Sequence, residues 1–243
     1  MTTSLDMKRI EQATSKAVAY YWITRKEQQQ RQISNGHSDQ GSRSAVTGGA
    51  QMDGFIRLFK DIIIEAGISP QYIFDHSSLE LPGYFRPTKK WDLLVVKENH
   101  LVLALEAKSQ VGPSFGNNFN NRTEEAMGSA LDLWTAYREG IFNVSTPPFL
   151  GYFFMLEDCT NSQSSIGIQE PHFKVFPEFS NSSYAKRYEL FCRKLVLERH
   201  YTSAVFITSK NDTGIDGLFV EPAVDLSIYP FLRAIESHIL NYV

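Results

Sequence analysis

The segment KKWDLLVVKENHLVLALEAKSQ, residues 89–110, constrains the fold more than any other part of the chain. Two runs of strand-forming residues flank the polar tetrapeptide KENH at 97–100, a pattern typical of a β-hairpin. The second run holds two charged residues, Glu106 and Lys108, inside an otherwise apolar stretch. Because side chains alternate along a strand, these two charges share one face, roughly 7 Å apart at the backbone.

The hairpin also brings a second acid close to Glu106. If KENH is the turn, the numbers of facing residues sum to about 197, which places Asp92 opposite Leu105, one step from Glu106. A small bulge or a different loop closure would bring the two carboxylates together. Two buried carboxylates with no basic partner between them repel each other and lose hydration. A divalent cation resolves both problems, and oxygen-only ligands completed by water favour Mg²⁺.

Asp92, Glu106 and Lys108 therefore predict a site for metal-assisted phosphodiester hydrolysis. Beside a cation the ammonium form of Lys108 is disfavoured, and its side chain can contact a phosphate oxygen or an attacking water. An alternative interpretation is that Glu106 and Lys108 form a surface salt bridge. An acid two residues before a lysine also occurs by chance, as in Asp6-Met7-Lys8.

The segment VGPSFGNNFNNR, residues 111–122, is rich in groups that can read bases. Its Gly and Pro content predicts a loop that leads into a helix beginning at the capping box formed by Asn121 and Glu124. Asparagine amides pair with adenine and arginine with guanine in the major groove. The candidate DNA-reading residues are Asn117, Asn118, Asn120, Asn121 and Arg122. The alternative is that some of these asparagines only supply turns and caps.

Charge restricts where a nucleic acid can bind. The chain carries a net charge of -3, so DNA binding must come from local patches. From Tyr84 to Lys108 there are five basic and three acidic residues, a local excess of two positive charges. Arg86, Lys89 and Lys90 are candidate contacts to the duplex backbone.

The order of the remaining segments predicts an α/β protein with a mixed central sheet flanked by helices. We expect helices at 5–33, 52–67, 120–140, 184–200 and 224–243, and strands at 84–96, 101–109, 147–158 and 204–209. Residues 34–51 have the composition of a mobile loop. No apolar run is long enough to cross a bilayer and the N-terminus does not resemble a signal peptide, so we expect a cytoplasmic protein.

Other chemistries find less support. No two of the six histidines have metal-ligand spacing, and no glycine-flanked serine resembles a nucleophile elbow. The two cysteines, Cys159 and Cys192, are interpreted as reduced structural thiols.

Asp92 followed by Glu106-Ala107-Lys108 fits the PD-(D/E)xK nuclease motif. The surrounding sequences GGAQMDGF, LPGYFRPTKKWD, KSQVGPSFGNNFNNRTEEA and PHFKVFPEF resemble the XhoI-type restriction endonucleases, over about Gly41 to Leu197. Trp91 stands where the signature has proline, and we expect it to pack in the core.

The resemblance implies a PD-(D/E)xK core and a Type II enzyme that cuts both strands of DNA at CTCGAG in the presence of Mg²⁺, leaving 5′ overhangs. It implies metal ligation by Asp92, Glu106 and the Ala107 carbonyl, and a possible further acid at Asp53, for which Asp61 and Glu65 compete. The implied partners are double-stranded DNA and a second copy of the chain, because a palindrome matches a symmetric dimer. A cognate methyltransferase would act on the same site.

We expect one nuclease domain over 1–243, with an N-terminal helix and loop at 1–51, a catalytic core at 52–160 and a C-terminal extension at 161–243 for DNA binding or dimerisation. Two rival functions stay open. A structure-selective repair or junction nuclease would cut regardless of sequence, and a non-catalytic DNA-binding protein would use the fold as a platform without cutting.

Overall fold

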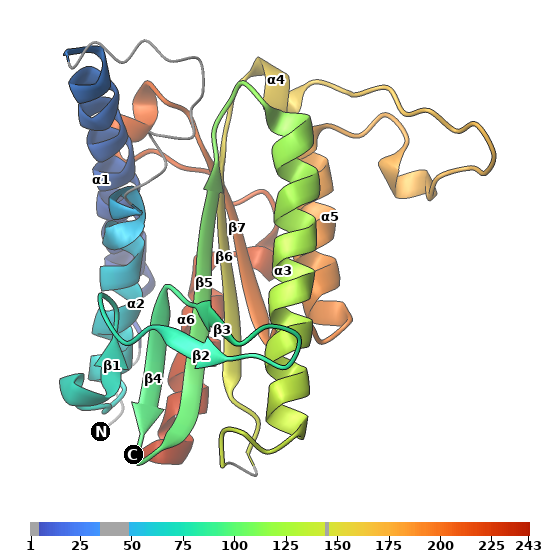
Figure 1. Ribbon diagram of the computed structural model, residues 1–243. Helices are drawn as coiled ribbons and strands as arrows, with labels where there is room; N and C mark the ends of the chain where they lie inside the picture. Colours follow the sequence, from blue (N-terminus) through green and yellow to red (C-terminus); the bar gives the residue numbers. More distant parts are fainter. Residues whose placement is uncertain (1–4, 35–48, 144–145) are drawn as a thin grey trace.

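A mixed sheet lies between two layers of helices in the computed structural model, which describes residues 5–34, 49–143 and 146–243 (Figure 1). Its strands, in spatial order, are β1 Ile73–Phe74, β4 Leu93–Lys97, β5 His100–Gln110, β6 Phe149–Glu157 and β7 Ser203–Ser209. The pairs β1/β4 and β4/β5 are antiparallel, whereas β5/β6 and β6/β7 are parallel. A separate two-stranded sheet consists of β2 Glu80–Pro82 and β3 Thr88–Lys90.

The helices form a layer on each face of this sheet (Figure 1). They are α1 Met7–Ser34, α2 Asp53–Glu65, α3 Phe115–Arg138, α4 Thr160–Gln163, α5 Tyr184–Leu197 and α6 Ile228–Ile239. The 3-10 helices are η1 Ala50–Met52, η2 Pro70–Tyr72, η3 Pro177–Phe179, η4 Thr213–Asp216, η5 Val224–Leu226 and η6 Leu240–Tyr242. The predicted α/β class with a mixed sheet flanked by helices is confirmed.

Two apolar clusters hold the layers together, one on each face of the sheet. The first unites α1, α2 and α6 with the sheet, and in it Phe55 of α2 lies against Phe153 of β6 with ring centroids 4.4 Å apart. The second unites α3 and α5 with the opposite face, where Tyr188 stacks on Phe154 at 4.1 Å. Because β6 is covered on both faces, its sequence is nearly continuously apolar.

Two local predictions were wrong. Residues 84–96 do not form one strand, because β3 and β4 are separated by Trp91 and Asp92. The Asn-rich segment is also not a loop up to residue 121, since α3 begins at Phe115 and Ser114 is its N-cap residue. Asn121 and Glu124 therefore lie inside the helix and form no capping box.

The early start of α3 has a packing cause. Phe115 and Phe119 are four residues apart and thus share a helix face. Their rings lie 5.7 Å from Tyr184 and 4.9 Å from Tyr188, respectively, so α5 supplies an apolar partner for the first two turns. Tertiary packing here outweighs the turn-forming preference of the Gly and Asn residues.

The C-terminal part of the chain contributes to the central architecture. Residues 161–243 supply β7 at one edge of the sheet and α5 and α6 in the two helical layers. Residues 35–48, most of the predicted mobile loop, lie outside the described residues. Within the described chain, no helix combines the length and the apolar character that a bilayer-spanning segment requires.

Candidate active site

The β4–β5 hairpin carries the predicted acids, and a bulge sets their alignment. Lys97 pairs with His100 at the turn, and the register then shifts between Val95 and Val96. Beyond the shift Leu93 pairs with Leu105, so the next residues, Asp92 and Glu106, come opposite each other. The predicted turn at 97–100 and the bulge needed to bring the two carboxylates together are thus confirmed.

Asp92 lies immediately before the first residue of β4, Leu93. Its Oδ2 accepts a hydrogen bond from the Ala107 backbone N–H at 2.8 Å, and its own N–H donates to the Leu105 carbonyl at 3.1 Å. The N–H and C=O groups of one residue leave a strand on the same side. The Ala107 carbonyl therefore faces the same strand edge as the Asp92 side chain.

Glu106 is buried, with 2% of its surface exposed, and protein groups contact both of its carboxylate oxygens. Its Oε1 accepts a hydrogen bond from Lys89 Nζ at 3.0 Å and lies 3.2 Å from Lys108 Nζ. Its Oε2 accepts a hydrogen bond from the Tyr201 hydroxyl at 2.8 Å. Burial raises the pKa of Glu106, but the two lysines and the Tyr201 hydroxyl outweigh it, so the pKa lies below its usual value.

This arrangement corrects the prediction that the two acids have no basic partner. Lys108 lies between them, 3.7 Å from Asp92 Oδ2 and 3.2 Å from Glu106 Oε1. Burial lowers the pKa of Lys108, but the attraction of Glu106 and Asp92 is stronger and the net pKa is raised. Without a cation, therefore, the ammonium form is favoured.

Lys89 was predicted to contact the DNA backbone, but it is turned inward. Its ammonium group lies 4.2 Å from the centre of the Trp91 ring and donates to Glu106. Burial lowers the pKa of Lys89 despite the attraction of Glu106. Trp91, only 1% exposed, packs in the core as expected and provides the flat face under this lysine.

A pocket of about 450 Å³ opens beside these groups. Asp92, Ala107 and Lys108 of the hairpin line one part of it. Arg25 of α1 and Gln51 of η1 line it as well. Sequence reasoning missed both, since no local pattern singles out Arg25 or Gln51.

The predicted DNA-reading residues divide into two groups. Asn118 and Arg122, on the first two turns of α3, line the pocket. Asn117, Asn120 and Asn121 are exposed on the same part of the helix. The pocket thus combines three cationic side chains, from Arg25, Lys108 and Arg122, with the acid Asp92.

The remaining predicted residues lie away from the pocket. Lys90 is exposed, and Arg86 donates from Nε to Asp132 Oδ2 at 2.7 Å, which ties the β2–β3 connection to α3. Asp53 does not line the pocket. Burial raises its pKa, and the charged groups that influence it are His76, Arg57 and Asp75. The structure therefore does not bring the candidate extra acid to the hairpin.

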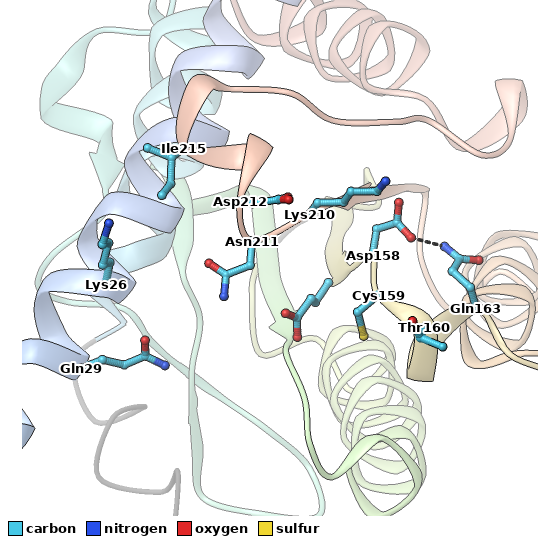
Figure 2. Close-up of a pocket in the computed structure, with 11 residues that line it drawn as sticks. Lys26, Gln29, Asp158, Cys159, Thr160, Gln163, Lys210, Asn211, Asp212 and Ile215 are labelled. Atoms are coloured by element: carbon cyan, nitrogen blue, oxygen red, sulfur yellow. Dashed lines mark hydrogen bonds between the residues drawn. The ribbon is translucent and has the colours of Figure 1, made fainter.

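A larger pocket of about 990 Å³ lies between α1 and the ends of β6 and β7 (Figure 2). It has three carboxylates, from Glu157, Asp158 and Asp212, against two ammonium groups, from Lys26 and Lys210. Asp158 accepts a hydrogen bond from Gln163 at 2.8 Å (Figure 2). This acidic excess disfavours a phosphate, so the smaller, cationic pocket is the better candidate for the active site.

The oxygen atoms at the hairpin fit a hard divalent cation. They are the carboxylates of Asp92 and Glu106 and the main-chain carbonyl of Ala107. In the described part of the chain, no three His, Cys, Asp or Glu side chains gather at one point. Gln51 Oε1, a buried oxygen of a residue that lines the same pocket, has no hydrogen-bond partner among the described residues.

Two facing acids, a lysine that reaches both and a cationic pocket beside a mixed sheet are the groups that metal-assisted phosphodiester cleavage by a nuclease requires. The family model "Restriction endonuclease XhoI" matches residues 31–221, more than half of the chain. The chain belongs to this family, and it is by class a site-specific deoxyribonuclease of Type II.

Three curated relatives agree with this assignment. The Type II restriction enzyme BstVI of Geobacillus stearothermophilus is 55% identical over 83% of this chain and 92% of its own length. The Type II restriction enzyme XhoI of Xanthomonas vasicola is 45% identical over 80% of this chain and 79% of its own. The Type II restriction enzyme AbrI of Azospirillum brasilense is 48% identical over 70% of this chain and 77% of its own. No solved structure is significantly similar to this chain.

Proposed function

We propose that this protein makes Mg²⁺-dependent double-strand cuts in DNA at CTCGAG, leaves 5′ overhangs, and does so with a PD-(D/E)xK core. The observation that carries the proposal is the alignment of Asp92 and Glu106 across a bulged hairpin, with Lys108 within 3.7 Å of both. Type II restriction enzymes generally use divalent metal ions and act on double-stranded DNA.

In the proposed mechanism Asp92, Glu106 and the Ala107 carbonyl hold the cation. When bound, Mg²⁺ supplies positive charge that polarises the scissile phosphate and lowers the pKa of a bound water. Lys108, which lies between the two acids, donates a hydrogen bond to the attacking water or to a phosphate oxygen. Lys89 and Tyr201 fix the orientation of Glu106 by hydrogen bonds to its two carboxylate oxygens.

Recognition is assigned to α3 and to the pocket walls. Arg25 and Arg122 line the pocket beside Lys108 and are suited to pair with phosphate oxygens. The exposed asparagines at the start of α3, Asn117, Asn120 and Asn121, read base edges together with Asn118. Arg86 and Lys90 are the remaining candidate contacts to the backbone of the duplex.

The palindromic site implies a homodimer, in which each copy reads one half. A cognate methyltransferase would protect the same sequence in the host without having to bind this protein. A restriction enzyme acts where the DNA is, so this protein is expected in the cytoplasm.

Plasmid digestion tests the proposal. With Mg²⁺ the protein should produce discrete fragments whose mapped ends lie at CTCGAG, and with EDTA it should produce none. Asp92→Ala or Glu106→Ala should abolish cleavage, because each removes a carboxylate from the cation site, while specific DNA binding by gel shift survives. Glu139→Ala, an exposed acid at the C-terminal end of α3, serves as the control and should cut normally.

Cleavage retained by either active-site variant would refute the assignment of these acids. Fragments without fixed ends would instead support a structure-selective nuclease. Intact plasmid with Mg²⁺, combined with normal DNA binding, would support a non-catalytic DNA-binding protein.

A further inference from the structure

Gln110, the last residue of β5, joins the catalytic strand to the start of α3 and to α5. It follows Lys108 by two residues on the same face of β5, because side chains alternate along a strand. Its Nε2 donates a hydrogen bond to the Phe115 carbonyl at 3.1 Å, and its Oε1 accepts one from the Tyr188 hydroxyl. The side chain is buried, so one amide connects three elements inside the protein.

These two contacts fix which way the amide of Gln110 points. A main-chain carbonyl only accepts hydrogen bonds, so the amide nitrogen must face Phe115 and the amide oxygen then faces Tyr188. Burial raises the pKa of Tyr188 above its usual value, so its hydroxyl stays protonated and donates. The ring of Tyr188 is buried and stacks on Phe154 of β6. The hydrogen-bond donor to Gln110 therefore comes from a ring that the core holds in place.

The first turn of α3 depends on contacts from other elements. Its N-cap residue, Ser114, makes no side-chain cap hydrogen bond. The ring of Phe115 stacks on Tyr184 with centroids 5.7 Å apart. Aromatic pairs are favourable over centroid distances of about 4.5–7 Å, whereas a hydrogen bond holds its two heavy atoms within about 2.7–3.2 Å. The bond from Gln110 therefore sets the main chain of Phe115 relative to β5 more narrowly than the ring contact does.

Asn118 and Arg122 extend this position into the active pocket. They follow Phe115 by three and seven residues, so they lie on the same side of α3. Both line the pocket together with Lys108 and Gln110. A shift of the first turn of α3 along β5 would therefore move these two side chains relative to the Lys108 ammonium group. A misplacement of about 1 Å at a reacting centre can cost about 100-fold in rate.

We propose that Gln110 is a positioning residue, which holds Asn118 and Arg122 of α3 in register with Lys108 and so couples recognition of the DNA sequence to its cleavage. This inference rests on the proposed function, because it assigns cleavage to the hairpin and recognition to α3. Loss of Gln110 should change discrimination between sites more than affinity for DNA, because every cationic side chain that attracts phosphates remains.

Cleavage of two duplexes tests the inference, one with the mapped site and one with a single base pair of that site changed. Gln110→Met keeps a similar volume but removes the amide. It should lower kcat at the mapped site by about 10-fold or more and lower kcat at the altered site less, so that discrimination falls. Its affinity for an unrelated duplex in EDTA should stay within about 2-fold of the parent value.

A double variant separates positioning from stability. Gln110→Met alone leaves the Tyr188 hydroxyl buried without its acceptor, which lowers the urea midpoint of unfolding. Gln110→Met combined with Tyr188→Phe removes both polar groups and should recover most of that loss. Discrimination by the double variant should stay as low as that of Gln110→Met. Discrimination that returns together with stability would show that Gln110 is only a structural residue and would overturn the inference.

Ser209→Ala is the matched control. Ser209 is likewise the buried last residue of a strand, β7. Its hydroxyl accepts a hydrogen bond from Trp22 Nε1 at 2.9 Å and donates one to the Leu218 carbonyl at 2.7 Å. Because Ser209 does not line the active pocket, its loss should lower the urea midpoint without changing discrimination. An equal loss of discrimination in Ser209→Ala would trace the effect to general destabilisation and overturn the inference.

The parent protein distinguishes failure of this inference from failure of the proposed function. If the parent cuts at a fixed site and Gln110→Met discriminates as well as the parent does, the inference falls and the proposed function stands. If the parent cuts at no fixed site, both fall.

Discussion

Tyr201 is one of two residues outside the β4–β5 hairpin, with Lys89, that donate a hydrogen bond to Glu106. Its hydroxyl reaches Glu106 Oε2 from the segment before β7, and burial raises its pKa well above the usual value, so the hydroxyl stays protonated and donates. A donor from so distant a part of the chain has no local sequence signal. Only the fold brings positions 106 and 201 together.

Tyr201→Phe should destabilise the protein by about 1.5–3 kcal/mol, because a buried carboxylate loses a hydrogen-bond donor. Cleavage should fall as well, since Glu106 is then held from one side only. Urea unfolding gives the first quantity and the initial cleavage rate the second.

Tyr152→Phe is a matched control for this change. The two rings lie 5.1 Å apart, but the Tyr152 hydroxyl is buried without a hydrogen-bond partner among the described residues. Its removal should therefore cost nothing or stabilise the protein. Equal losses for both variants would mean that the ring packing, and not the Glu106 contact, is being measured.

At the scale of elements, the carboxylate of Asp132 on α3 binds the connection between β2 and β3. Asp132 Oδ1 accepts the backbone N–H groups of Tyr84 and Phe85, each at 2.7 Å, and Oδ2 accepts Arg86 Nε at 2.7 Å. A Cβ on Gly83 would come within 2.1 Å of Asp132 Oδ2, so only glycine allows this approach. Burial raises the pKa of Asp132, but these donors outweigh it and the net pKa lies below the ordinary 3.8.

The contacts of the Asp132 carboxylate predict a pH-dependent contribution to stability. A carboxylate with a lowered folded-state pKa stabilises the fold above its ordinary pKa, and this contribution is lost as the pH falls through the folded-state pKa. Asp132→Asn should therefore reduce the free energy of unfolding by about 1–3 kcal/mol at neutral pH. The difference from the parent should shrink as the pH falls below about 3.8.

Urea unfolding at a series of pH values measures this difference. Asp61→Asn, an exposed acid of α2, is the control and should show no comparable pH dependence. A penalty for Asp132→Asn that stays constant down to about pH 2 would contradict the role given to its charge.

The sequence predicted those elements whose signal is contained in one short stretch of the chain. The hairpin, its turn at 97–100 and the buried strand β6 follow from alternation and apolar runs, because these patterns reflect local geometry. The start of α3 was missed because Phe115 and Phe119 are helical only in combination with Tyr184 and Tyr188 of α5. Arg25 and Gln51 were missed in the site for the same reason, since α1 and η1 meet β5 only in the fold.

For the molecule as a whole, the net negative charge opposes DNA binding, whereas the candidate pocket carries a local positive excess. The net charge is -3, and the larger pocket beside α1 has an acidic excess. The active pocket has three cationic side chains and one acid along its walls. We therefore expect affinity to depend strongly on these few cations and on the ionic strength.

Arg25→Gln should weaken DNA binding to all sequences alike and reduce the slope of log K against log salt concentration by about one. Lys26→Gln, the next residue, removes the same charge from the wall of the acidic pocket and should change the slope less. Fluorescence anisotropy with a CTCGAG duplex in EDTA at several salt concentrations compares the two. Identical slopes for both variants would show that Arg25 has no special contact.

The bulge between Val95 and Val96 has a consequence beyond the site itself. Residues paired across a hairpin share a face, so adding or removing one backbone unit between turn and acid reverses the odd–even match of the two strands. Without this shift, the register that starts at Lys97 and His100 would pair Asp92 with Leu105, although Asp92, Glu106 and Lys108 would all still be present. The proposed activity thus depends on the number of residues between the turn and the two acids, which a list of the functional side chains does not contain.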